Sequence, residues 1–295
     1  MKIAMMGVGR LGTQLVFNLV SNPKIEEIQI YDIIKDRVEG TILDISHAYP
    51  EFSGKMRAVD GGIDADIIII TAGYPRKPED TRLQLLEKNK KIMSDVLKLL
   101  KLTKNTIIIV LTNPVEPLTH YIYKNADLDW RKVIGFSNML DTARLKYVIS
   151  KATNVNAGKI KTFIIGEHGE KMIPLFSQTT VGGKKLEEFD VDMNEMEKKT
   201  KMENKRILET MGGTQFGPGT HLSNLVNAIL NDSNEIFPLS FYLNEEHYSL
   251  KDVCVSLPVR VGRMGIKEVV ELEINDEEKR RLKELADALK EMEIS

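Results

Sequence analysis

Three glycines near the start of the sequence have the spacing of a phosphate-binding turn. Gly7, Gly9 and Gly12 follow a strand-like apolar run and precede residues 13–20, whose leucines and valines recur at helical spacing. The first glycine permits a tight bend, the second lets a pyrophosphate approach the backbone, and the third allows close helix packing. Asp32 ends the next strand-like run, where a carboxylate accepts hydrogen bonds from ribose hydroxyls. The pattern predicts a dinucleotide site, and it favours NAD because Asp32 would repel the extra phosphate of NADP.

A histidine in the second half has the chemistry for proton transfer. His168 lies between Glu167 and Gly169, on a turn that follows a strand-like run at 160–165. An imidazole with its ordinary pKa of about 6.5 accepts and returns protons near neutral pH. Hydride transfer between an alcohol and a nicotinamide needs such a base, an anchor for the substrate and positive charge near the carbonyl oxygen. A turn histidine taken alone is more often structural.

The elements that must position these residues alternate in the first half between short strands and helices. This alternation is typical of a parallel sheet with helices on both faces. Apolar side chains at helical spacing within 85–100 predict a crossover helix. The strands are expected at 2–6, 27–31, 66–71, 106–112 and 132–136. We therefore expect an α/β protein with a Rossmann doubly wound parallel sheet in residues 1–137.

The second half, residues 138–295, is less regular and predicts an α+β substrate domain. A strand is expected over 160–165, and a helix with a charged, solvated face over 193–211. Asn275 and Glu278 form a plausible N-terminal capping pair for a last helix. No Pro/Gly/Ser-rich linker separates the halves, so the boundary near residue 137 is only loosely defined.

Bulk composition excludes several classes of partner. With 41 basic and 43 acidic residues, the net charge is −2, so we expect no nucleic-acid partner. The longest apolar runs are far shorter than the ~20 residues of a membrane span, so no membrane association is expected. Cys254 is the only cysteine, which excludes an internal disulfide and a cysteine-based zinc site. We expect no metal and a cytoplasmic location, since the glycine motif begins too early to leave room for a targeting segment.

Five ordered motifs resemble those of the lactate/malate dehydrogenase family over nearly the whole chain. They are Gly7-x-Gly-x-x-Gly12, Thr71-Ala-Gly-Tyr-Pro-Arg-Lys-Pro78 continuing to Arg82, Thr112-Asn-Pro-Val115, Leu140-Asp-Thr-Ala-Arg144 and Ile165-Gly-Glu-His-Gly169. The resemblance implies an NAD-dependent oxidoreductase that transfers a hydride between NAD and a small 2-hydroxy acid. It also implies a homodimer or homotetramer.

The resemblance assigns catalytic and substrate-binding roles to matching positions. It implies that His168 is the proton acceptor and that Asp141 orients it. Arg144 would bind the C1 carboxylate of the substrate through both arms of its guanidinium, and Arg82 would polarise the carbonyl. Without the family context, Asp141 and Arg144 would more simply be an ion pair on a helix surface, because they lie three residues apart.

The remaining implied contacts concern the cofactor and the substrate pocket. Asn113 would contact both the cofactor and the substrate oxygen, Thr214 would line the substrate side, and Pro218 would pack near the nicotinamide. The cofactor-binding positions implied by the motifs are Gly7, Gly9, Arg10, Leu11, Gly12, Asp32, Thr71, Ala72, Gly73, Asn89, Leu111, Thr112 and Asn113.

Arg76 occupies the loop position on which substrate choice in this family largely rests. Malate enzymes carry arginine there, whereas lactate enzymes usually carry glutamine. An arginine enclosed without a carboxylate partner costs roughly 3–5 kcal/mol, and oxaloacetate supplies a second carboxylate whereas pyruvate does not. Glu79 and Asp80 are more typical of lactate enzymes, and 172–174 looks more like malate ones. We expect a malate dehydrogenase of the tricarboxylic acid cycle, with L-lactate dehydrogenase as the alternative.

Two other classes of function remain as alternatives. A non-catalytic NAD-binding module would keep the glycines, but the intact His168, Asp141, Arg82 and Arg144 argue against it. An NAD-dependent glycosidase is compatible with the fold but would need a metal, and no cysteine–histidine cluster accompanies the motifs. NADP is the less favoured cofactor, although the nearby cations of Lys35 and Arg37 weaken that preference.

Overall fold

The computed structural model of the chain describes residues 1–75 and 81–294. Arg76, Glu79 and Asp80 of the expected specificity loop lie outside the described residues. The helices are α1 (Arg10–Val20), α2 (Lys35–Ala48), α3 (Arg82–Lys98), α4 (Val115–Asn125), α5 (Met139–Thr153), α6 (Met193–Met211), α7 (Phe216–Asn231) and α8 (Asp276–Ile294). The strands are β1 (Lys2–Met6), β2 (Glu27–Tyr31), β3 (Met56–Ala58), β4 (Ile67–Ile70), β5 (Ile107–Val110), β6 (Val133–Gly135), β7 (Ile160–Lys161), β8 (Ile164–Ile165), β9 (Ile173–Pro174), β10 (Thr180–Val181), β11 (Lys184–Lys185), β12 (Ile236–Tyr242), β13 (Cys254–Gly262) and β14 (Gly265–Val269).

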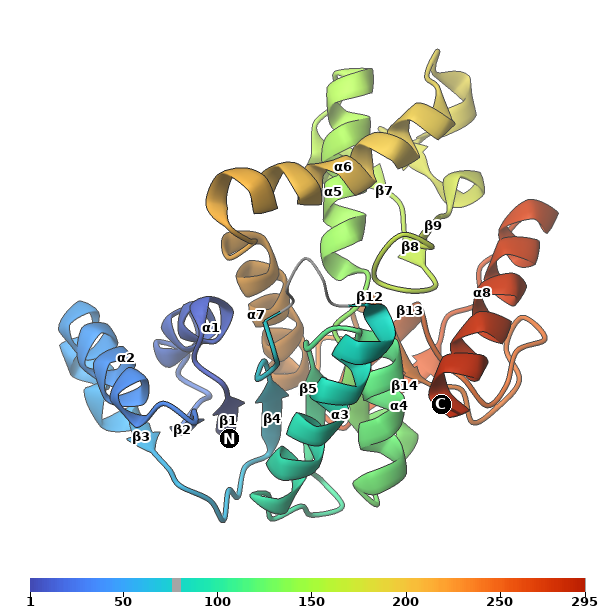
Figure 1. Cartoon of the computed structure of the whole chain (residues 1–295). Coiled ribbons are helices and arrows are strands. Elements are labelled where there is room, and N and C mark those ends of the chain that lie inside the picture. The colour runs from blue at the N-terminus through green and yellow to red at the C-terminus, as the bar shows by residue number, and fades with distance from the viewer. Residues whose placement is uncertain (76–80, 295) are drawn as a thin grey trace.

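The main sheet contains the predicted parallel core. Six parallel strands lie in the order β3-β2-β1-β4-β5-β6, which confirms the Rossmann arrangement (Figure 1). The strand order reverses between β1 and β4, and a crevice forms beyond the carboxyl ends of strands at such a point. Gly7 follows β1 and Thr71 follows β4, so both motifs lie at this edge.

Alternating side chains of the buried strands build one apolar layer on each face of the sheet. In β4, Ile67 and Ile69 pack with α1, α2 and α7, whereas Ile68 and Ile70 pack with α3 and α4. Successive side chains of a strand point to opposite faces, so a continuous isoleucine run requires cover on both sides. This requirement explains why helices flank the sheet on both faces.

The sheet continues into the second half of the chain. Strands β12, β13 and β14 add to β6 in antiparallel fashion, and Ser240 of β12 faces Gly135 of β6. A Cβ atom at Gly135 would lie 2.7 Å from the Cβ of Ser240, so the glycine permits this close approach. The sequence predicted a parallel sheet confined to the first half, and the structure adds three antiparallel strands that cover its edge.

Other elements of the second half agree with the sequence except at one point. Helix α6 has the predicted bounds, and Asn275 and Glu278 exchange hydrogen bonds of 3.0 and 2.8 Å in front of the last helix. The single strand expected at 160–165 is wrong, because the chain forms two short strands there. β7 ends at Lys161 and pairs with β10, whereas β8 begins at Ile164 and pairs with β9.

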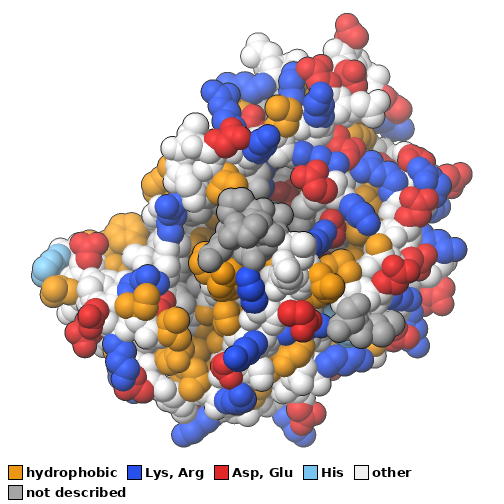
Figure 2. Space-filling view, viewed as in Figure 1, with side chains coloured by type: hydrophobic (Ala, Val, Ile, Leu, Met, Phe, Trp, Pro, Cys, Tyr) orange, Lys and Arg blue, Asp and Glu red, His pale blue; other side chains and the backbone are white. Residues whose placement is uncertain are grey.

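The visible surface has no region of a single charge sign. On the face in Figure 2, Lys and Arg side chains are interspersed with Asp and Glu side chains. Among the residues that the structure describes, no helix is both long enough and apolar enough to cross a membrane.

Gly12 gives a direct test of the packing of α1 on β1. A Cβ atom at Gly12 would lie 2.1 Å from the carbonyl oxygen of Gly7, whereas a Cβ at Gly9 would meet nothing within 4 Å. We expect Gly12→Ala to lower the free energy of unfolding by about 1–3 kcal/mol, measured by urea denaturation. Gly9→Ala is the matched control and should stay within about 0.5 kcal/mol of the parent. Equal stability of the two variants would contradict this packing.

Candidate active site

The turn after β1 has the geometry that a dinucleotide requires. The Val8 and Ile34 amides each donate to the Asp32 carboxylate over 2.9 Å, which fixes Asp32 beside the glycine turn. Gly9 is the N-cap of α1, and no side chain caps the first amides of the helix. The open space above Gly9 and the uncapped helix end suit a pyrophosphate, and the fixed carboxylate suits a ribose. The residues present therefore fit NAD.

The loop after β4 is hydrogen-bonded to this turn, and the loop after β5 is hydrogen-bonded to the loop after β4. The Thr71 hydroxyl donates to the Gly7 carbonyl over 2.8 Å, and the Thr112 hydroxyl donates to the Ala72 carbonyl over 2.6 Å. Asn89 of α3 is buried, accepts from the Tyr74 amide over 2.7 Å and donates to the Asn113 carbonyl over 2.7 Å. The side chain of Asn89 thus ties together the loops that follow β4 and β5.

Residues of the glycine motif also contact the second half of the chain. Arg10 donates to the carbonyl of Met211 over 2.8 Å, at the end of α6. Leu11 lines a cleft together with Thr214 and Pro218. The cofactor side and the predicted substrate side therefore meet along α1, the end of α6 and the start of α7.

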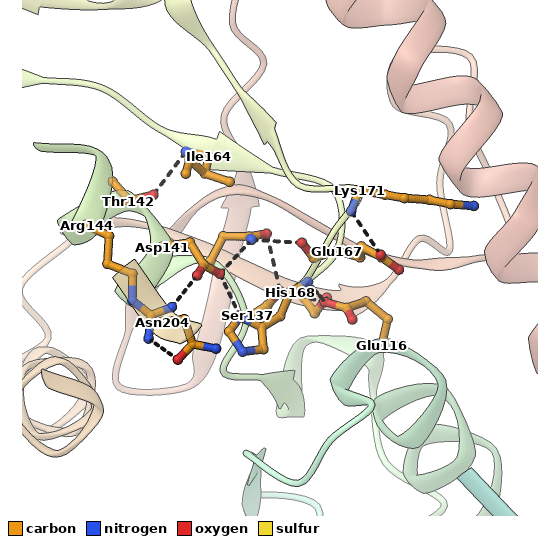
Figure 3. A network of polar contacts seen from close by, with 12 residues as sticks. Glu116, Ser137, Asp141, Thr142, Arg144, Ile164, Glu167, His168, Lys171 and Asn204 are labelled. Atoms are coloured by element: carbon orange, nitrogen blue, oxygen red, sulfur yellow. Dashed lines mark hydrogen bonds and ion pairs between the residues drawn. The ribbon is translucent and has the colours of Figure 1, made fainter. Parts of the chain in front are cut away.

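His168 and Asp141 form a short polar contact in the site. Nδ1 of His168 lies 2.6 Å from Oδ2 of Asp141, and Asp141 is buried in the first turn of α5 (Figure 3). The Asp141 carboxylate raises the pKa of the His168 imidazole, although burial acts in the opposite direction. Burial opposes ionisation of Asp141, but the charge and the hydrogen bond of His168 lower the pKa of Asp141. The arrangement therefore stabilises an imidazolium paired with a carboxylate.

Arg144 joins the same network one helical turn later. Its Nη1 atom donates to Oδ1 of Asp141 over 2.7 Å, and Nη2 donates to Oδ1 of Asn204 over 3.0 Å. Arg144 is 9% exposed, so this is a buried pair rather than the helix-surface pair that spacing alone would suggest. Its Nε atom is buried and has no partner among the described residues.

A cleft of about 210 Å³ brings many of the predicted residues together. His168 and Arg144 line it with Asn113 and Thr214, and the apolar part of its wall includes Leu111. Among the residues that the structure describes, no group of three or more His, Cys, Asp or Glu side chains is arranged to hold a metal.

Arg82, like Asp141, is a predicted catalytic residue that does not line this cleft in the described part of the chain. It forms two parallel hydrogen bonds to Glu167, of 3.1 and 2.7 Å, and it is partly exposed at the start of α3. Glu167 is 1% exposed and also accepts from the Lys171 amide over 3.2 Å. The carboxylate next to His168 in sequence therefore holds Arg82 at the side of the site.

Sequence reasoning missed several residues that support the pair. Asn138 donates to Asp141 over 3.2 Å and to the Glu167 carbonyl over 3.0 Å. Glu116 accepts from the His168 amide over 3.1 Å, and Asn204 contacts Arg144 from α6. Only Glu116 gave a sequence signal, because it is an acid within the apolar first turn of α4, directly after the Asn113 motif.

Both parts of the chain match models of known families. Residues 1–135 match the lactate/malate dehydrogenase, NAD binding domain. Residues 138–294 match the lactate/malate dehydrogenase, alpha/beta C-terminal domain.

Relatives and solved structures give the same result. L-lactate dehydrogenase 2 of Bacillus cereus is 34% identical over 304 residues, covering 98% of this chain and 96% of the relative. The malate dehydrogenase of Cryptosporidium parvum is 30% identical with a TM-score of 0.90, covering 99% of this chain and 98% of that one. The malate dehydrogenase of Aeropyrum pernix is 31% identical with a TM-score of 0.88, covering 99% and 97%. With an NAD-binding domain and an alpha/beta C-terminal domain along its length, the chain belongs to the lactate/malate dehydrogenase family.

Proposed function

We propose that the chain is an NAD-dependent malate dehydrogenase that interconverts malate and oxaloacetate. The observation that carries the dehydrogenase activity is the contact of His168 with the buried Asp141, because His168 lies with Arg144 and Asn113 in one cleft. The observation that supports malate is the arginine at position 76, in the loop that determines specificity in this family.

The proton is handled by the histidine pair. Asp141 accepts a hydrogen bond from Nδ1 of His168, so Nε2 is the nitrogen left to accept a hydroxyl proton from malate. The glycine turn and Asp32 would hold NAD, which would supply the acceptor for the hydride from C2. The imidazolium that results is stabilised by the adjacent carboxylate, and it returns the proton when oxaloacetate is reduced.

The substrate is held by arginines. Arg144 is fixed by Asp141 and Asn204 and lines the cleft, so its guanidinium is placed to bind the C1 carboxylate. Arg82 polarises the carbonyl after exchanging Glu167 for the substrate. The side chain of Arg82 is partly exposed, and the exchange would remove the charge partner of the buried Glu167 carboxylate. Positive charge then lies where the carbonyl oxygen becomes negative.

Lactate is the alternative substrate. The curated Bacillus relatives at 33–34% identity are named L-lactate dehydrogenases, and the acids at positions 79 and 80 favour the same assignment. Malate is preferred because an enclosed Arg76 would lack a charge partner with pyruvate. Steady-state rates with oxaloacetate and pyruvate, each with NADH and NADPH, distinguish these assignments.

The cofactor preference rests on Asp32. Its carboxylate is held by two backbone amides, and Arg37 lies 3.6 Å from it. We propose NAD over NADP because this fixed negative charge opposes a 2′-phosphate, although Arg37 offsets part of the charge. The cytoplasmic location and the homodimer or homotetramer stay predictions.

His168→Asn tests the proton acceptor. The variant removes the imidazole but leaves the cofactor turn unchanged, so we expect NADH to bind as in the parent while kcat falls by about 100-fold to 10,000-fold. NADH binding is followed by fluorescence and kcat by NADH oxidation. His47→Asn, at an exposed histidine of α2, is the control and should keep full activity. A fully active His168→Asn enzyme would refute the assignment.

Asp141→Asn tests the role of the carboxylate through pH. Reduction of oxaloacetate needs the imidazolium, so its rate falls as pH rises through the pKa of His168. Asp141 raises that pKa, so its loss should move the alkaline limb of the profile to lower pH and reduce kcat by about 100-fold. Asp287→Asn on the exposed face of α8 should leave the profile in place. An unmoved limb in Asp141→Asn would contradict the pairing.

Arg76→Gln tests the substrate. Loss of the guanidinium should shift the ratio of kcat/KM for oxaloacetate over pyruvate toward pyruvate by roughly 100-fold to 3,000-fold, since the enclosed charge no longer selects a second carboxylate. Lys77→Gln removes the neighbouring cation and should change the ratio less than about fivefold. The charge argument fails if both variants change the ratio equally.

A further inference from the structure

A further buried carboxyl group contacts the loop that carries His168. Glu116 lies in the first turn of α4 and has no exposed surface. Its Oε1 atom accepts from the His168 backbone amide over 3.1 Å and from the Ser137 hydroxyl over 2.5 Å (Figure 3). The same atom accepts from the Ser240 hydroxyl over 3.1 Å. One oxygen atom thus links α4 to the histidine loop, to the segment before α5 and to β12.

The hydrogen bonds and the burial act on Glu116 in opposite directions. Three donors on one carboxylate oxygen favour the ionised form. Its Oε2 atom is buried and has no partner among the described residues, which favours the neutral form. Burial raises the pKa of Glu116 above its ordinary value, and the hydrogen bond from Ser137 and the positive charge of His168 offset only part of that rise. The ionisation of Glu116 therefore depends on the charges of the neighbouring residues.

The charged groups around Glu116 come from each element that meets at the site. His168 and Glu167 lie on the histidine loop, Asp141 and Arg144 on α5, and Arg82 at the start of α3. Glu167 disfavours ionisation of Glu116, and Glu116 in turn contributes to a raised pKa of Arg82. Glu116 also raises the pKa of His168, as a smaller effect than that of Asp141.

We propose that Glu116 is a positioning residue for His168, because its Oε1 atom fixes the backbone of the histidine loop and its ionised form stabilises the imidazolium. This inference rests on the proposed function of His168 as the proton acceptor. Asp141 acts on the ring directly, whereas Glu116 acts from the backbone side of the same residue. The two carboxyl groups together favour the protonated histidine that the reductive direction requires.

Glu116→Gln removes the negative charge of the side chain but keeps nearly the same shape. Glutamine keeps an oxygen for the three donors but cannot ionise, so the His168 ring should titrate at lower pH than in the parent. The titration is followed by NMR of the histidine ring protons, with the His168 signals assigned by their absence in His168→Asn. The alkaline limb of oxaloacetate reduction should move in the same direction, with kcat reduced above neutral pH and little change in KM.

Two variants complete the experiment. Glu116→Asp retains the negative charge, so its His168 titration should lie closer to that of the parent even where stability falls. Glu246→Gln makes the same chemical change at an exposed loop carboxylate and should cause no shift. An unshifted His168 titration in folded Glu116→Gln overturns the proposal, and so does an equal shift in Glu116→Gln and Glu116→Asp.

Ser240→Ala keeps the proposal testable if Glu116→Gln does not fold. Ser240 is fully buried in β12, and its loss removes one donor that favours ionised Glu116. The His168 titration should then shift in the same direction by a smaller amount, and no shift counts against the role of Glu116. Because the NMR titration needs no turnover, a parent enzyme inactive on malate would overturn the proposed function and leave the Glu116 result interpretable.

Discussion

The buried contact between His168 and Asp141 determines how the surrounding residues must be arranged. A carboxylate removed from water is costly unless charges and donors compensate it. Asp141 receives His168 on one oxygen and Arg144 on the other, with Asn138 as a further donor. Compensation of the Asp141 charge therefore places His168, the proposed base, and Arg144, the proposed substrate anchor, next to each other at the start of α5.

The same need for compensating partners applies to Glu167 and Glu116, the two other acids that contact the histidine loop. Glu167 is compensated by the two guanidinium hydrogen bonds of Arg82, whereas Glu116 is held on one oxygen by an amide and two hydroxyls. The difference between these partners matters for function. A salt bridge with a partly exposed arginine can be exchanged for a ligand, whereas contacts from the backbone and from buried serines are permanent parts of the fold.

The parts of the molecule that the sequence predicts correctly are those whose signal is local. Strands β1, β2, β4 and β5 are short apolar runs, and α6 and α8 carry helical periodicity with recognisable ends. His168, Asp141 and Arg144 lie in motifs of a few residues, and the structure brings them together. The antiparallel strands β12 to β14, the division at Thr162 and the pairing of Arg82 with Glu167 depend on segments distant in sequence. Periodicity and spacing carry no information about such contacts.

The single sheet that runs through both halves has a consequence for the synthesis of the chain. β6 leaves the ribosome well before β12, its partner on that side, and translation proceeds at about 5–20 residues per second. During those seconds the nascent Rossmann unit has an uncovered strand edge, which is a template for pairing with other chains. Gly135, at which β6 pairs with β12, has no side chain that would keep a strand of another chain at a distance. Efficient production of this protein therefore depends on shielding that edge until the last third of the polypeptide has emerged.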